Sequence, residues 1–219
     1  QSGSAVGLGI SRPIASRTNT DATERQATDP TSMDERFYFC RKTDFDTAIK
    51  YAKLDQWAKF KDFYSRFRGA IVKRQALDRI MIGFNGTSIA ANTDITANPL
   101  LQDVNKGWLQ KMREENASRV MKSGAVLNKI TIGTTGDYKN LDALVMNIVD
   151  EMIDDVHQGN PDLVVMCNRK TVSDKYFPLV NKDQDNSEKL AADIIISQKR
   201  MGGLPVYSVP FFPEGIIFV

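Results

Sequence analysis

The chain has 219 residues, of which 42% are hydrophobic and 26% charged, a balance typical of an ordinary globular protein. A chain of this length fits one sizeable domain or two small ones, and it can bury a core without disulfides or metal ions. The net charge of +2 indicates no general surface for polyanions. No apolar stretch approaches the roughly 20 residues that a membrane-spanning helix needs.

Residues 1–36 are rich in Ser, Thr, Gly, Arg and Asp and contain few large apolar side chains. Such a segment buries too little surface to hold itself together. We therefore expect it to be disordered, or to be an extended arm that needs a partner. Apolar residues then recur two apart over 37–39 and 45–49, a spacing that predicts half-buried strands.

A long amphipathic helix is predicted from Asp55, which can cap it, to about Ile82, and Asn85-Gly86 supplies a stop. At 1.5 Å per residue this helix would be about 40 Å long, well beyond the usual three or four turns. Its opposite face is basic. The simplest interpretation is a solvated face on a core helix; the alternative is a face that contacts nucleic acid or a neighbouring subunit. The charged residues are Lys59, Lys61, Arg66, Arg68, Lys73, Arg74 and Arg79, offset by Asp62 and Asp78.

Helices and strands are mixed through the rest of the chain. A loop is predicted over 86–102, because Pro99 bars regular helix. Further helices are predicted over 102–121, 140–152, 169–176 and 190–198. Strands are predicted over 125–133, 162–168, 206–210 and 215–219. Since the two kinds of element do not alternate regularly, the pattern favours an α+β fold.

A polar run between the last two predicted helices is the first candidate for chemistry. Asp183, Asp185 and Ser187 match the start of a calcium-binding loop, in which oxygen ligands occupy alternate positions. The match fails where the geometry is strictest, because Glu188 replaces the glycine of the sharp turn and Ile194 replaces the bidentate glutamate. We expect no metal site there. The composition alone does not exclude general acid–base catalysis by a pair of these carboxylates.

Other reactive residues offer no catalytic arrangement. His157 is the only histidine, so sites that need two imidazoles are excluded, and it is expected to be a cation at the end of a helix. Cys40 and Cys167 lack metal or disulfide spacing, which suits a reducing cytoplasm, and both are expected to behave as small hydrophobic residues. No phosphate-loop, dinucleotide or zinc spacing is present. The residues therefore predict no catalytic residue, no cofactor and no metal, and a protein whose partner is itself or another protein.

Several long blocks resemble the major capsid protein of P-two-type tailed bacteriophages, in collinear order over nearly the whole chain. The blocks are "ATERQATDP", "LDQWAKFKDFYSRFRGAIVKRQALDRIMIGFNGTS", "GWLQKMREENASRVM", "DYKNLDALVMNIVDEMI" and "KYFPLVNKDQDNSEKLAADIIISQKR". The resemblance implies the Hong Kong 97 coat-protein fold, an α+β shell subunit.

On that template, residues 1–36 are an extended loop, the E-loop, that lies over a neighbouring subunit. Residues 37–139 are a peripheral domain, with its spine helix at about 55–82, and residues 140–219 are the axial domain. The chain begins Gln-Ser-Gly-Ser rather than with Met and stops inside a strand-like run, so we expect a piece of a longer protein with an incomplete peripheral domain.

The function that the resemblance implies is assembly rather than catalysis. Copies of the chain would form hexamers and pentamers of an icosahedral shell, with an internal scaffolding protein and a portal. The shell would enclose double-stranded DNA without sequence-specific binding, and no membrane is expected. The expected location is the virion, and the host bacterial cytoplasm during assembly. The candidate contacts between subunits are Arg17, Glu24, Arg25, Lys182, Asp183, Asp185, Asn186 and Glu188. The alternatives are an encapsulin-type shell and an enzyme that uses Asp183, Asp185 or Glu188.

Overall fold

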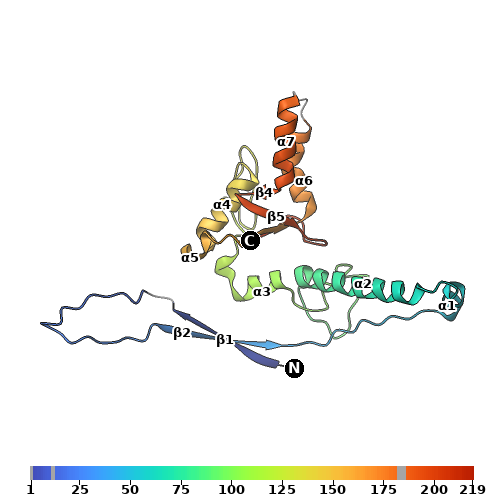
Figure 1. Ribbon diagram of the computed structural model, residues 1–219, viewed down its shortest axis with the longest axis horizontal. Helices are drawn as coiled ribbons and strands as arrows, with labels where there is room; N and C mark the ends of the chain where they lie inside the picture. Colours follow the sequence, from blue (N-terminus) through green and yellow to red (C-terminus); the bar gives the residue numbers. More distant parts are fainter. Residues whose placement is uncertain (1, 11–12, 182–185) are drawn as a thin grey trace. The chain divides into compact units, whose positions relative to one another are not determined.

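The computed structural model describes residues 2–10, 13–181 and 186–219. The chain divides into two compact units, Gln1–Asp46 and Thr47–Val219. Helices and strands are both present in irregular order (Figure 1), so the predicted α+β class is confirmed.

The N-terminal unit is a long β-hairpin. Strand β1 (Ser2–Ile10) pairs antiparallel with β2 (Thr31–Phe39), in a register that sets Ser2 opposite Phe39 and Ile10 opposite Thr31. The hydrogen bonds of this ladder hold together most of a segment that the sequence alone predicted to be disordered or to be an extended arm that needs a partner. The strand predicted over 45–49 is wrong: no regular element lies between Phe39 and Tyr51, because no neighbouring strand is there to pair with it.

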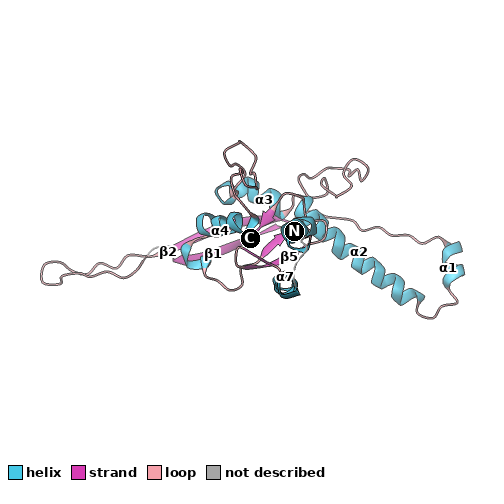
Figure 2. Ribbon diagram, turned by 90° about the horizontal axis from the view of Figure 1, so that it is seen from above, coloured by secondary structure: helices cyan, strands magenta, loops and turns pink. Residues whose placement is uncertain are grey.

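The second unit begins with two helices in place of the single one predicted. Helix α1 (Tyr51–Trp57) and helix α2 (Phe63–Asn85) are separated by turns over 58–62 (Figure 2). Asp55 therefore lies inside α1 and caps nothing, whereas Asp62 takes the position that precedes α2. The predicted stop is confirmed, because the Gly86 amide donates to the Ile82 carbonyl at 2.8 Å and ends α2.

The next predicted helix is shorter than expected. Residues 86–107 form a loop that folds back on itself: the amides of Thr87 and Ser88 both donate to the Gln102 carbonyl, and Gly107 donates to Gly86. Because residues 102–107 are used in these contacts, helix α3 starts only at Trp108 and ends at Glu115. A short 3-10 helix, η1 (Ala117–Arg119), follows.

The strand predicted over 125–133 is also wrong. The region is a set of turns with two isolated bridges, Val126 to Lys129 and Ile132 to Tyr138. Asp137 holds these turns through its carboxylate, which accepts the amide of Ala125 at 2.6 Å and both the amide and the hydroxyl of Thr131, at 2.7 and 2.6 Å. The backbone groups are thus satisfied by one side chain instead of by a sheet.

The C-terminal elements follow the predictions closely. Helix α4 (Leu141–Met152) is capped by Asn140, whose side chain accepts the Ala143 amide at 2.8 Å. The remaining elements are α5 (Asp155–Gln158), β3 (Val165–Cys167), α6 (Arg169–Val180), α7 (Asn186–Gln198), β4 (Arg200–Met201), β5 (Leu204–Ser208) and β6 (Ile217–Phe218). The sheet order is β4-β5-β3-β6, with β3 parallel to β5 and antiparallel to β6.

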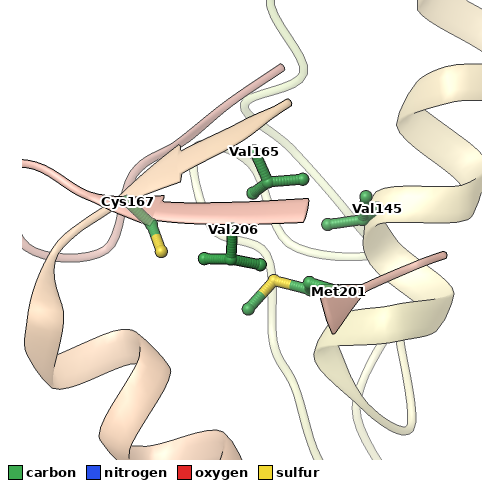
Figure 3. Packing of buried hydrophobic residues seen from close by; sticks show 5 residues of the cluster. All are labelled: Val145, Val165, Cys167, Met201 and Val206. Carbon is green, nitrogen blue, oxygen red and sulfur yellow. The ribbon is translucent and has the colours of Figure 1, made fainter. Parts of the chain in front are cut away.

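Two apolar cores hold this unit together. The larger lies between α4 and the sheet and consists of Val145, Val165, Cys167, Met201 and Val206 (Figure 3). The smaller joins the end of α2 to α3 and to the chain after β5. There the Phe84 ring lies 5.0 Å from Trp108, edge to face, and 4.8 Å from Phe212.

Candidate interaction surfaces

The β1–β2 hairpin carries an apolar face that the described residues of its own unit leave exposed. Residues directly opposite each other in an antiparallel pair point to the same side, so one side collects the larger apolar residues of both strands. All are exposed, from Ile10 at 62% to Phe37 at 79%. This hairpin apolar face consists of Val6, Leu8, Ile10, Met33, Phe37 and Phe39. Exposed apolar patches of this kind are typical of sites that bind another surface.

The other side of the same hairpin carries small and polar residues together with one aromatic residue, Tyr38. Gly3, Gly7 and Gly9 face, respectively, Tyr38, Asp34 and Ser32 across the ladder. Since an isolated two-stranded hairpin is marginally stable in water, the division into one apolar and one polar side favours a partner on the apolar side. Sequence reasoning missed this face, although the alternation of glycine with Val6, Leu8 and Ile10 in "AVGLGI" was a usable signal.

Three of the predicted contact residues lie in the segment that joins β1 to β2. Arg17, Glu24 and Arg25 are all exposed, and none forms an ion pair with any residue in the described part of the chain. The segment is ordered locally by a turn at Asn19, whose side chain accepts the Asp21 amide at 3.1 Å and whose carbonyl accepts the Thr23 amide at 3.1 Å. The structure therefore brings these three residues into one exposed segment.

The other predicted contacts belong to the second unit. Lys182, Asp183 and Asp185 lie outside the described residues. Helix α7 begins at Asn186, and Glu188 is exposed in its first turn. Helices α6 and α7 contact each other (Figure 1) and expose several apolar side chains. These are Phe177, Val180, Leu190, Ile194 and Ile195.

The first two helices of this unit expose aromatic and basic side chains together. The rings of Trp57 and Phe60 lie 5.6 Å apart near the turns between α1 and α2, and both are about half exposed. Arg66 pairs with Asp62 at 2.6 Å and Arg74 with Asp78 at 2.7 Å. The basic face predicted from the sequence is thus partly neutralised along α2 itself.

The reactive side chains of the described residues are dispersed in the fold. The described residues contain no group of three His, Cys, Asp or Glu side chains that could hold a metal ion. His157 is exposed in the last turn of α5, as predicted. The prediction for Cys40 is wrong, because this residue follows β2 and is exposed; Cys167 is buried as expected. Among the helices described, none is long and apolar enough to cross a membrane.

The surroundings of Asp137 and Cys167 shift the pKa values of these two side chains. Hydrogen bonds from the Ala125 amide, the Thr131 hydroxyl and the Thr131 amide lower the pKa of Asp137 to about 2. Burial raises the pKa of the Cys167 thiol, as expected for an inert core cysteine. Asp137 organises the turns over 123–138, and Cys167 fills the larger core.

An α+β subunit with uncovered apolar surfaces on two units is the architecture of a protein that associates with other chains. The whole chain, residues 1–219, matches the model of the phage major capsid protein family, P2 family. The chain therefore belongs to the P2 family of phage major capsid proteins.

Individual relatives agree with the family. The chain is 48% identical over 224 residues to the capsid proteins of Escherichia phage P2, covering 99% of this chain and 63% of that protein. It is 37% identical over 227 residues to the major capsid protein of Serratia phage KSP20, covering 100% of this chain and 65% of that protein. The chain thus spans slightly less than two thirds of the length of these relatives.

A solved structure is similar as well. A chain from a satellite phage P4 procapsid that includes the size determination (Sid) protein matches with a TM-score of 0.83 and 45% sequence identity. The match covers 97% of this chain and 65% of that chain. The α+β architecture is therefore close to that of a phage procapsid protein.

Proposed function

We propose that the chain is part of a coat subunit that assembles with copies of itself into the icosahedral head of a tailed bacteriophage. The hairpin apolar face carries this proposal, because in a chain of a capsid protein family it offers a surface whose natural partner is another copy. Nine paired residues extend over about 30 Å at roughly 3.3 Å per residue, which is long enough to reach over a neighbouring subunit.

The proposed fold is that of Hong Kong 97-type coat proteins. In this assignment residues 1–36 belong to the extended loop, α2 is the spine helix of a peripheral domain over 37–139, and residues 140–219 form the axial domain. The larger core lies wholly within residues 140–219, which supports treating that segment as one body. The greater length of the relatives supports a subunit that is longer than this chain.

The proposed contacts between copies are of two kinds. The hairpin apolar face supplies buried area, and the charged residues Arg17, Glu24, Arg25 and Glu188, with those of the run 182–186, set the register. Complementary charge fixes orientation and excludes wrong partners more than it adds affinity. Hexamers and pentamers of the shell would use the same surfaces.

Further partners follow from the same proposal. Assembly would take place in the host bacterial cytoplasm with an internal scaffolding protein and a portal, and the finished shell would be part of the virion. It would enclose double-stranded DNA without reading its sequence, which a chain with a net charge of only +2 permits. Family membership favours this function over an encapsulin-type compartment and over an enzyme.

The test is assembly of the complete gene product, expressed with its neighbouring genes and viewed by negative-stain electron microscopy. We expect uniform icosahedral particles for the wild type. Leu8→Asp and Met33→Asp place a charge on the hairpin apolar face and should abolish particles while leaving the circular dichroism spectrum unchanged. The matched control is Ser32→Asp, which places the same charge on the polar side of the same hairpin and should assemble.

Two results would count against the proposal. Only monomers or small oligomers from the wild type, with the scaffolding protein present, would contradict the coat function itself. Normal particles from both Leu8→Asp and Met33→Asp would show that the hairpin apolar face is not a contact between copies.

A further inference from the structure

A groove of about 1070 Å³ lies within the second unit. Its walls come from α3, the turns over 119–132, α4, α6 and the segment 214–219. The groove shares no described residue with the hairpin apolar face or with α7, so the proposed contacts between copies do not account for it.

The floor of the groove is apolar and rich in methionine. Met112, Met121 and Met152 line it together with Ile130 and Ile148, and all five side chains are half-buried. Methionine is unbranched and polarizable, so a surface that contains several of them adapts to the shape of an apolar partner. Grooves of this composition are typical of sites that take the apolar face of an amphipathic helix.

The rim of the groove has a surplus of positive charge. Lys170 pairs with Glu214 at 3.3 Å and Arg119 pairs with Asp154 at 2.9 Å, so these charges are compensated. Three further cations on the rim are exposed and form no ion pair with the described residues, namely Arg113, Lys122 and Lys139. The lining also contains one acidic side chain, Asp174, that forms no ion pair with the described residues.

We infer that this groove binds an acidic amphipathic helix of a different protein. The apolar side of such a helix would cover the methionines, and its carboxylates would meet Arg113, Lys122 and Lys139. Helix α2 of a second copy fits less well because it is basic, and helix α7 offers only two carboxylates, Glu188 and Asp193, against Lys189. The inference goes beyond the proposed function, which assigns no binding surface on this chain to a helix of another protein.

The test uses the unassembled chain and a synthetic helical peptide with leucines on one side and glutamates on the other. A matched peptide carries lysine in place of every glutamate. The chain is labelled at its methionine methyl groups, of which it has eight. Three report on the groove, and five serve as internal controls: Met33, Met81, Met146, Met166 and Met201.

We expect the glutamate peptide to shift the methyl resonances of Met112, Met121 and Met152 and to bind more weakly as salt rises. The Lys122→Glu, Lys139→Glu double variant should weaken its binding about tenfold. Lys189→Glu, a charge reversal on α7 away from the groove, should leave the affinity unchanged.

The inference is overturned if the lysine peptide binds as tightly as the glutamate peptide, or if the groove methyls do not move at saturation. Equal shifts at Met33, which lies on the hairpin apolar face, would indicate unspecific apolar binding and would overturn it too. Because binding is measured without assembly, these results are independent of whether the subunit forms shells.

Discussion

Asn85 and Phe211 are 126 residues apart in the chain, and the side-chain amide of Asn85 donates a hydrogen bond of 2.8 Å to the Phe211 carbonyl. The same amide donates to the Met81 carbonyl at 3.0 Å, so the buried Asn85 ties the end of α2 to the chain after β5. Phe211 has a φ of 59°, which is unfavourable for a residue with a side chain, and this contact helps to hold it there.

Asn85→Ala should lower the free energy of unfolding by about 1–3 kcal/mol, because it leaves the Phe211 carbonyl without its partner in a partly buried place. Urea unfolding followed by tryptophan fluorescence measures this, since Trp108 lies against the neighbouring Phe84. Asn92→Ala is the control: Asn92 is exposed, and its replacement should change stability little. Equal stability of Asn85→Ala and wild type would contradict the structural role of this contact.

Gly202→Ala should destabilise the larger core. Gly202 has a φ of 57°, a conformation that costs other residues about 1–2 kcal/mol. A methyl group there would also lie 2.7 Å from the Val145 side chain, which is fully buried. Gly159→Ala is the matched control, because a methyl group at Gly159 meets nothing within 4 Å. Thermal unfolding of the two variants should separate them clearly; similar melting temperatures would disprove the constraint at Gly202.

Asp137→Asn should alter the dependence of stability on pH. The folded pKa of Asp137 is about 2, below its usual value of 3.8, so the ionised carboxylate stabilises the fold. This contribution is complete above the unfolded pKa and is lost as the pH falls from about 4 through about 2.

The Asp137→Asn variant lacks the stabilising contribution of the ionised carboxylate at every pH. The difference in melting temperature between wild type and Asp137→Asn should therefore be constant near neutrality and shrink below about pH 4. Asp162→Asn, which removes an exposed carboxylate, controls for the change in net charge. A difference that grows on acidification would show that the sign is wrong.

The two cysteines should differ in reactivity. Cys40 is exposed, whereas Cys167 is buried and has a raised thiol pKa, so a thiol reagent should modify only Cys40 in the native chain. Complete modification of both should require denaturant. Cys40→Ser should abolish the fast reaction, and fast labelling that persists in this variant would mean that the larger core opens readily.

Hydrogen exchange should report on the hairpin. In the unassembled chain the amides of β1 and β2 should exchange faster than those of β3 and β5, because nearly every hairpin residue is exposed whereas Val165 and Val206 lie in the core. In assembled particles the hairpin amides should become protected. Strong protection of β1 in a monomer would contradict the need for a partner.

The sequence predicted the C-terminal half of the chain best. Asn140 is a strong cap followed by an apolar pattern of helical period, and the run 163–167 is apolar without interruption, so α4 and β3 were recognisable from local signals. The α+β class followed from the order of such elements.

The misses have local physical reasons. The turns between α1 and α2 contain no proline or glycine, and the apolar spacing continues through Trp57, Phe60 and Phe63. Only Asp62 indicated in the sequence that the helix is interrupted there. The turns over 123–138 have the composition of a strand. Their amides, however, donate to the carboxylate of Asp137 and not to a neighbouring strand. The hairpin depends on pairing between residues 2–10 and 31–39, a register that no short window contains.

The distance along the chain between Asn85 and Phe211 has a consequence for synthesis on the ribosome. At roughly 5–20 residues per second, the 126 residues between them take roughly 6–25 seconds to be made. Trp108 can cover the Phe84 ring early in that interval, but Phe212 is made only at the end of it. The smaller core is therefore completed late, and the nascent chain exposes the end of α2 to chaperones and to other nascent coat chains until then.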